Sequence, residues 1–283
     1  MRGERARNQT APRLLFANVS DHNNAVTLPR FYHPHLRTGE VELHPGEARH
    51  AGGSRRLRAG DAVTLFDGQG NEADGWLVRV GGRNASIRVV VSAVRTVPRP
   101  APVALTIAVS PPKQSRQDTL IEKCTELGVA AIQPILVERT ISQVAAGRAE
   151  RWRRVAIAAA KQSQQAWLPE FHEPVGLKEL LDSANGYDLV LLAEPVAGAV
   201  PLADVLDPHP RLTRILAIIG PEGGLTAGEL AIARNAGAVF CRLTPTILRI
   251  ETAAVALAAI VLSRPARQQQ PLGGQQDPDG RTE

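Results

Sequence analysis

The stretch Ile218-Ile219-Gly220-Pro221-Glu222-Gly223-Gly224 is typical of a buried strand that ends in a glycine-rich turn, with a helix after it. In open α/β sheets, ligands bind beyond the carboxyl ends of the strands, where a glycine turn lets them approach the backbone closely. The stretch is no phosphate-binding loop, because Gly-Lys-Ser or Gly-Lys-Thr does not follow, and it lacks the Gly-x-Gly-x-x-Gly dinucleotide pattern. Taken alone, it predicts either a ligand-binding turn or an ordinary tight connection between a strand and a helix.

The segments on both sides of this turn alternate between strand and helix patterns, which predicts an α/β domain. Nearly continuous apolar runs indicate strands that are covered on both faces, as in a parallel sheet. The predicted strands span residues 103–109, 131–137, 188–192, 215–219 and 239–243.

Helix signals lie between these strands. Ser115 and Asp118 resemble a capping box at the start of the first helix, and Gly128 is expected to end it. Cys124 lies on the apolar face of this helix, so we expect it in the core. A second capping-box pattern, Thr226 with Glu229, predicts the start of another helix. The remaining predicted helices span residues 150–166 and 251–263.

A different pattern precedes the α/β domain. Between residues 31 and 97, short apolar runs are broken by turn residues, which predicts a small β-barrel or β-sheet whose strands pair by hairpins. Arg99-Pro100-Ala101-Pro102 is expected to be a stiff linker. The predicted organisation is a flexible basic arm (1–27), the β domain (28–98), the α/β domain (102–265) and a disordered tail (266–283).

Length and composition limit the class of protein. The 283 residues are enough for about two domains. The longest apolar run, residues 253–262, is half of the ~20 residues that a membrane span needs, so we expect no membrane contact. Cys124 and Cys241 lie far apart and provide neither a disulfide framework nor a metal-ligand spacing, which favours the cytoplasm.

The positive charge is concentrated near the N-terminus. Residues 1–100 hold 15 basic and 9 acidic residues, an excess of 6, whereas residues 101–283 hold 18 basic and 19 acidic residues. This excess favours a polyanion partner such as nucleic acid, or it serves solubility alone. The basic segment Ser54-Arg55-Arg56-Leu57-Arg58 is accordingly either a solvated loop or a phosphate-contacting patch.

The histidines of the N-terminal region show neither zinc spacing nor the order of a nucleophile triad, so we expect surface or turn positions and no metal. These residues are His33, His35, His44 and His50.

The segment after the last predicted strand places an arginine and a glutamate at the start of an apolar helix. Capping accounts for Glu251 and Thr252, since helix starts favour acidic and hydroxyl side chains. It does not account for Arg249, which lies near the positive end of the helix dipole. An arginine there needs a carboxylate, a phosphate or a ligand oxygen to offset its charge.

Four segments follow one another along the chain: Phe31-Tyr32-His33, Glu126-Leu127-Gly128-Val129, Ile219-Gly220-Pro221-Glu222-Gly223-Gly224-Leu225 and Leu248-Arg249-Ile250-Glu251-Thr252-Ala253. Together they resemble the RsmE family, the uridine N3-methyltransferases of small-subunit ribosomal RNA in the SPOUT superfamily. The resemblance covers about residues 30–264. It implies an RNA-binding PUA-like β-barrel, an α/β domain with a deep trefoil knot that binds S-adenosylmethionine, and a homodimer that acts on ribosomal RNA or the assembled small subunit.

The resemblance also implies roles for individual residues. The cofactor is expected against three strand-end loops, at Leu192, Ala193, Glu194, Ile219, Gly220, Pro221, Glu222, Gly223, Gly224, Leu243, Leu248 and Ile250. RNA contacts are expected at Arg55, Arg56, Arg58 and Lys113. Holding the methyl carbon against the uracil nitrogen is expected to supply most of the rate. Arg249 is expected to stabilise negative charge on the imide oxygens, with Glu251 orienting that guanidinium or accepting the N3 proton.

The chain departs from the family pattern at several positions. Thr244 stands where the family usually has glycine, and Ile250 where it usually has threonine. The segment Lys161-Gln162-Ser163-Gln164-Gln165 lacks both the acid and the arginine of the usual Glu-Gln-Ser/Cys-x-Arg. These departures leave two alternatives open: a methyltransferase of the same fold that acts on a different RNA, and an RNA-binding relative without catalysis.

Overall fold

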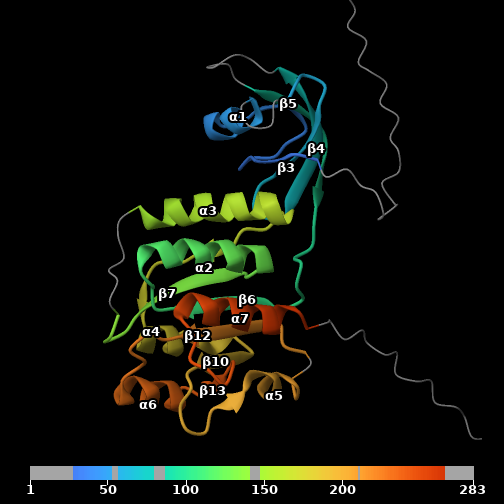
Figure 1. The fold of residues 1–283 in the computed structure, drawn as a ribbon. Coiled ribbons are helices and arrows are strands. Elements are labelled where there is room, and N and C mark those ends of the chain that lie inside the picture. Colours follow the sequence, from blue (N-terminus) through green and yellow to red (C-terminus); the bar gives the residue numbers. More distant parts are fainter. Residues whose placement is uncertain (1–27, 53–56, 80–86, 141–146, 210, 265–283) are drawn as a thin grey trace, which may run out of the picture.

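The computed structural model describes residues 28–52, 57–79, 87–140, 147–209 and 211–264. Figure 1 shows a smaller β-sheet with one short helix above a larger sheet that is flanked by helices. The predicted basic arm and C-terminal tail lie outside the described residues.

The smaller sheet joins five described strands in the order β1-β3-β4-β5-β2. Its elements are β1 (Arg30–Tyr32), β2 (Gly39–Glu42), α1 (Pro45–Gly52), β3 (Ala62–Phe66), β4 (Asn71–Arg79) and β5 (Arg88–Thr96). Strands β3, β4 and β5 pair as antiparallel hairpins, as predicted. The expectation of hairpins alone is wrong for β1, which pairs in parallel with β3, and for β2, which pairs with the distant β5. Phe31, Leu65 and Val89 are fully buried in the core of this sheet.

The larger sheet joins eight described strands, all paired in parallel, in the order β11-β13-β10-β12-β6-β7-β8 with β9 beside β7. They are β6 (Ala104–Val109), β7 (Ala131–Leu136), β8 (Glu170–Phe171), β9 (Val175–Gly176), β10 (Leu189–Ala193), β11 (Val200–Pro201), β12 (Arg214–Ile219) and β13 (Val239–Arg242). All five predicted strands are present with ends within one residue of those predicted. Strands β8, β9 and β11 have two residues each, too few to produce an apolar run.

The helices cover both faces of the larger sheet. They are α2 (Gln114–Leu127), α3 (Arg148–Ser163), α4 (Leu177–Asp182), α5 (Leu202–Leu206), α6 (Ala227–Asn235) and α7 (Ile250–Leu262), with a 3₁₀ turn at Ala184–Gly186. Helix α2 packs against both α3 and α7, as Figure 1 shows, whereas α4 packs against α6. None of the helices among the described residues is long and apolar enough to cross a membrane.

The predicted helix ends are partly confirmed. Thr226 and Glu229 form the predicted capping box, and Gly128 ends α2 with a φ of +84°. The capping box at Ser115 is wrong, because α2 begins at Gln114 and has no side-chain cap. Asp118 instead accepts a hydrogen bond at 2.9 Å from Arg151 of α3. The side chain that the sequence pattern predicts to cap α2 therefore connects α2 to α3.

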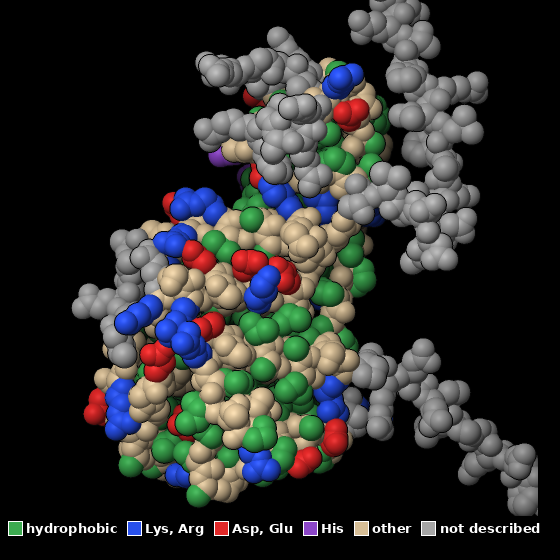
Figure 2. All heavy atoms as spheres, in the orientation of Figure 1, with side chains coloured by type: hydrophobic (Ala, Val, Ile, Leu, Met, Phe, Trp, Pro, Cys, Tyr) green, Lys and Arg blue, Asp and Glu red, His purple; other side chains and the backbone are tan. Residues whose placement is uncertain are grey.

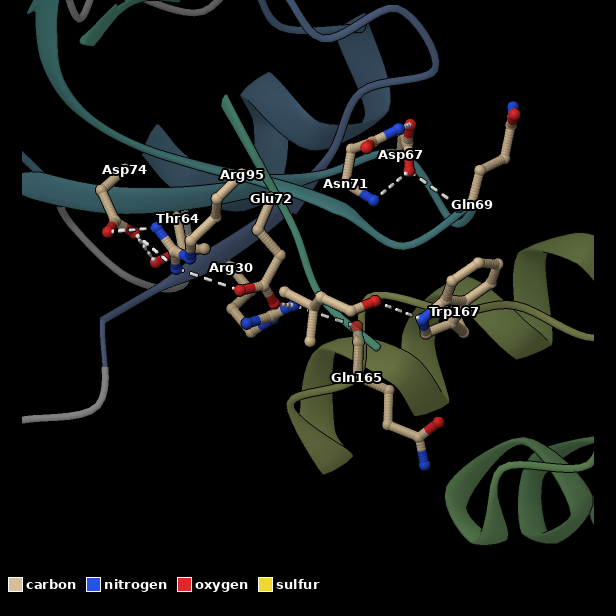
Figure 3. Close-up of polar contacts among 11 residues, drawn as sticks. Arg30, Thr64, Asp67, Gln69, Asn71, Glu72, Asp74, Arg95, Gln165 and Trp167 are labelled. Carbon is tan, nitrogen blue, oxygen red and sulfur yellow. Dashed lines mark hydrogen bonds and ion pairs between the residues drawn. The ribbon is translucent and has the colours of Figure 1, made fainter. Parts of the chain in front are cut away.

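A seam of hydrogen bonds and ion pairs joins the two sheets (Figure 3). The buried Arg30 guanidinium pairs with Glu72 and donates to the backbone carbonyl of Gln165 at 3.0 Å. The indole N–H of Trp167 donates to the carbonyl of Val97 at 2.9 Å. We call the contacts among these five residues, with the neighbouring turn 67–71, the seam.

The segment that departs from the family pattern lies at this seam. Lys161 donates to Glu47 of α1 at 2.9 Å, and the carbonyl of Gln165 is the acceptor for Arg30. In this chain, residues 161–165 therefore connect the end of α3 to α1 and β1.

Gly70 gives a test of how tightly the seam is packed. Gly70 has a φ of +91°, and a Cβ there would lie 2.2 Å from the Trp167 ring. Gly60 has a φ of +96° with nothing within 4 Å of a Cβ, so Gly60→Ala carries the backbone strain without the clash. We expect Gly70→Ala to lower the free energy of unfolding by about 1–3 kcal/mol more than Gly60→Ala, measured by urea denaturation. Equal costs would mean that Trp167 moves aside freely.

Candidate functional site

A cavity of about 300 Å³ opens where the loops after β10, β12 and β13 meet. The three strands are neighbours in the parallel sheet, so their carboxyl ends lie at the same edge. The lining residues are Ala193, Glu194, Pro195, Ile219, Gly220, Pro221, Glu222, Gly223, Gly224, Cys241, Arg242, Leu243, Thr244, Thr246, Ile247, Leu248, Ile250 and Ala253. Residues far apart in the chain thus form one concave, largely apolar surface.

Eleven of the twelve predicted cofactor residues line this cavity. Leu192 does not, because its side chain is fully buried in the sheet core beneath the loop. The sequence analysis did not name Arg242, the last residue of β13, or Thr246 and Ile247 of the loop after it as individual cofactor residues, although all three line the cavity. Ile247 is 88% exposed at the cavity, which marks it as an unpacked apolar side chain beside the opening.

The glycine loop 220–224 forms one wall of the cavity. Its turn closes through a hydrogen bond from the Gly224 N–H to the Pro221 carbonyl at 2.8 Å, and Gly224 has a φ of +69°. A Cβ at Gly220 would lie 3.2 Å from the Leu225 side chain and 3.4 Å from a Glu194 carboxylate oxygen. Arg139 donates to the Gly223 carbonyl at 2.6 Å and supports the loop from outside. Glycine therefore keeps this wall open and lets a ligand meet the backbone.

Glu194 lies opposite the glycine loop. Its carboxylate is half-buried, and within the described part of the chain it has neither an ion-pair nor a hydrogen-bond partner for its side chain. Burial raises the pKa of the Glu194 carboxyl above its ordinary value.

A second, much smaller cavity of about 20 Å³ adjoins the first and shares Pro221, Glu222 and Ile250 with it. Lys113, which is exposed at the start of α2, lines the smaller cavity. Arg116 of α2 forms an ion pair with Glu222 of the glycine loop, and its Nε lies 3.8 Å from Oε1 of Glu251. Arg116 therefore links α2, the glycine loop and the start of α7.

The two predicted catalytic residues are not paired with each other. Arg249 is the N-cap residue of α7 and is exposed, and its guanidinium has no hydrogen-bond or ion-pair partner among the described residues. Glu251 lies beside Arg116 instead, and the structure has no ion pair between Glu251 and Arg249 among the described residues. Glu251 is 13% exposed, and its Oε2 is a buried acceptor for which no described residue supplies a donor.

Sequence reasoning missed Arg116, because nothing in the spacing relates residue 116 to residues 222 and 251. Neither Arg249 nor Glu251 lines the larger cavity, although their neighbours Leu248 and Ile250 do. Both residues thus lie next to residues that line the cavity.

The predicted RNA contacts are described only in part. Arg55 and Arg56 lie outside the described residues. Arg58 is exposed, and its backbone N–H donates to the Asp61 carboxylate at 2.7 Å. Figure 2 shows Lys and Arg side chains over the α2–α3 layer, interspersed with acidic ones.

The contacts of two N-terminal histidines agree with the prediction that these residues lie in turns. Nδ1 of His33 and Nδ1 of His44 each accept from a backbone N–H two residues on, at 3.3 Å.

Comparisons with known proteins place this geometry in context. A family model described as an RNA methyltransferase domain matches residues 99–262, and one described as an RNA methyltransferase PUA domain matches residues 45–90. Ribosomal RNA small subunit methyltransferase E of Synechocystis is 34% identical over 207 residues, which are 72% of this chain and 67% of that one. The protein of the same name from Mycobacterium tuberculosis is 34% identical over 235 residues, 79% of this chain and 87% of the relative.

Solved structures agree. Ribosomal RNA small subunit methyltransferase E from Neisseria gonorrhoeae, bound to S-adenosyl methionine, superposes with a TM-score of 0.74 at 32% identity over 83% of this chain and 96% of the other. A methyltransferase from Legionella pneumophila in complex with the same cofactor gives a TM-score of 0.76 at 29% identity, over 83% and 97% of the two chains. The predicted α/β methyltransferase fold with a PUA-like domain in front of it is confirmed.

Proposed function

Because this chain belongs to the RNA methyltransferase family that includes ribosomal RNA small subunit methyltransferase E, we propose that it transfers a methyl group from S-adenosylmethionine to N3 of a uridine in small-subunit ribosomal RNA. The observation that carries the proposal is the cavity built by three strand-end loops of the parallel sheet. Its place is the one where α/β sheets bind cofactors.

The residues present fit this cofactor. A volume of about 300 Å³ is at the lower end for a small-molecule site. The glycine loop leaves the backbone open, Leu243, Leu248 and Ile250 offer apolar surface, and Glu194 offers an acceptor without a partner. Bound there, S-adenosylmethionine supplies a methyl group on a positively charged sulfur.

Arg249 and Glu251 fit a substrate at the edge of the cavity. The Arg249 guanidinium has no partner and is placed to stabilise negative charge on the uracil imide oxygens. Of the two roles expected for Glu251, the proton acceptor has the better support, because its buried Oε2 has no donor among the described residues. Lys113 and Arg58, both exposed, are the described candidates for phosphate contacts.

A homodimer in the cytoplasm is part of the proposal. Along α7 no charged residue follows Glu251 until the helix ends, yet Val255, Ala256, Ala259 and Ile260 are only partly buried. A second copy of the chain that covers this helix would remove apolar surface from water.

Arg116 gives a test of the link between the glycine loop and α7. Arg116→Met should lower kcat/KM for methyl transfer by about tenfold, because Glu222 and Glu251 would lose the cation between them. Arg151→Met is the matched control, since it breaks an ion pair from α3 to α2 away from both cavities. Arg116→Lys should restore part of the rate. Equal effects of Arg116→Met and Arg151→Met would contradict the link.

The proposed function is tested on small ribosomal subunits that lack N3-methyluridine. The protein is incubated with them and with S-adenosylmethionine that carries a labelled methyl group, and the digested RNA is analysed by mass spectrometry. Labelled N3-methyluridine at a single position is the expected result. Label in another nucleoside or another RNA would favour the same-fold methyltransferase with a different target. Cofactor binding without transfer to any RNA would favour the non-catalytic relative.

A further inference from the structure

Glu194 is an acidic side chain that lines the larger cavity, and no described residue forms an ion pair with it. The backbone on both sides of it is held, because the Glu194 N–H donates to the Leu192 carbonyl at 3.0 Å and its own carbonyl accepts from Val196 at 2.8 Å. Its carboxylate reaches across to the glycine loop, where Oε1 lies 3.1 Å from the place of a Cβ at Gly224. Glycines at 220 and 224 thus make room for this carboxylate.

The other charged residues at the cavity have partners or are exposed. Glu222 is neutralised by its ion pair with Arg116. Arg139 is outside the lining and donates to the Gly223 carbonyl. Arg242 lines the cavity but is an exposed residue. Among the described lining residues, Glu194 is therefore the acid whose negative charge a bound cation could neutralise.

Resting on the proposed function, we propose that Glu194 is the residue by which the cavity distinguishes the cationic cofactor from its neutral product. In the transfer, the uracil N3 forms a bond to the methyl carbon while the carbon–sulfur bond breaks and its electron pair stays on sulfur. The sulfonium becomes a neutral thioether, and the N3 proton passes to an acceptor such as Glu251. The positive charge next to Glu194 disappears with the methyl group.

This change of charge favours exchange of product for fresh cofactor. A half-buried carboxylate is stabilised by a nearby cation and loses that stabilisation when the cation becomes neutral. Because burial raises the pKa of Glu194, a proton binds the carboxylate more readily once the cation is gone. As pH falls through this pKa, Glu194 becomes neutral, and the preference for the cationic ligand should disappear.

The test is isothermal titration of the full-length protein with S-adenosylmethionine and with S-adenosylhomocysteine at neutral pH. We expect the wild-type protein to bind S-adenosylmethionine about tenfold more tightly than S-adenosylhomocysteine. The expected ratio is modest because Glu194 is only half-buried, so solvent weakens its interaction with the cation. Glu194→Gln should remove this preference by weakening only the cationic ligand. Asp204→Asn is the matched control, since it removes an exposed carboxylate of α5 that is not among the lining residues, and it should leave the ratio of the two affinities unchanged.

Each outcome decides a different point. If the wild-type protein binds neither ligand, the proposed function fails. If it binds both and Glu194→Gln weakens both equally, Glu194 contacts a group that the ligands share, and the inference is overturned. It is also overturned if neither affinity changes. A thermal shift assay guards against a folding defect, because Glu194→Gln should keep the apo melting temperature or raise it, while reducing the shift that S-adenosylmethionine produces.

Discussion

Replacing Arg249 with alanine should lower kcat for methyl transfer by about 10²–10³-fold and leave the affinity for S-adenosylmethionine unchanged. Arg249 is an exposed cation at the N-terminus of α7, where the helix dipole disfavours positive charge, and no described residue offsets it. An interaction made only when negative charge develops on the substrate affects kcat. Arg249 lies between Leu248 and Ile250, which line the cavity, and this position supports the proposal that it faces the substrate.

The same geometry predicts an opposite effect on stability. Removing a cation from the positive end of a helix should stabilise the fold by a few tenths of a kcal/mol, about the lower end of dipole effects. Activity would fall while the melting temperature stays the same or rises. Arg154→Ala is the control, because Arg154 is also an exposed arginine without a partner among the described residues, and it lies on α3 away from both cavities. An unchanged kcat in Arg249→Ala would remove this residue from the mechanism.

Replacing Gly220 with leucine should reduce the affinity for S-adenosylmethionine by at least about 100-fold. A Cβ at this position already lies 3.2 Å from Leu225 and 3.4 Å from Glu194, so the longer side chain has to enter the cavity between them. Gly220 has no positive φ, so the backbone itself accepts a side chain. The loss should therefore appear in binding more than in folding.

The control for this variant is Gly228→Leu. Gly228 lies in α6, is exposed, and has nothing within 4 Å of a Cβ. Calorimetric titration of both variants, together with their melting temperatures, separates cavity filling from general destabilisation. Binding of S-adenosylmethionine by Gly220→Leu with near wild-type affinity would show that the cofactor does not use this wall.

The sequence predicts those parts of the site that follow from the positions of strands and loops. It does not predict those that depend on contacts between side chains far apart in the chain. The meeting of the loops after β10, β12 and β13 could be predicted, because parallel strands end at one edge of a sheet whatever their distance in the chain. The pairing of Arg116 with Glu222 could not, since the two residues are 106 positions apart and neither belongs to a local pattern. Likewise, Arg249 and Glu251 are two positions apart in sequence, yet the helix start separates them and Arg116 is the neighbour of Glu251.

Local signals compete with tertiary contacts in the fold as well. Thr226 forms its predicted cap, because one oxygen of Glu229 accepts from the Thr226 N–H at 2.8 Å while the other oxygen accepts from the Glu138 N–H at 2.8 Å. Asp118 had the same pattern with Ser115 but pairs with Arg151. Strands β1 and β2 have three and four residues, too few for an alternating pattern to be recognised.

The close fit of Gly70 under the Trp167 ring limits how this protein can be recombined. If the smaller sheet were replaced by that of another protein, the new sheet would need glycine at the position of Gly70, or the chimera would need a smaller side chain in place of Trp167. Gly68 sets a similar condition, because a Cβ there would lie 2.7 Å from Leu168. The smaller sheet and the larger sheet therefore fit each other closely at this contact. Replacing either one requires the turn 67–71 and residues 167 and 168 to be redesigned together.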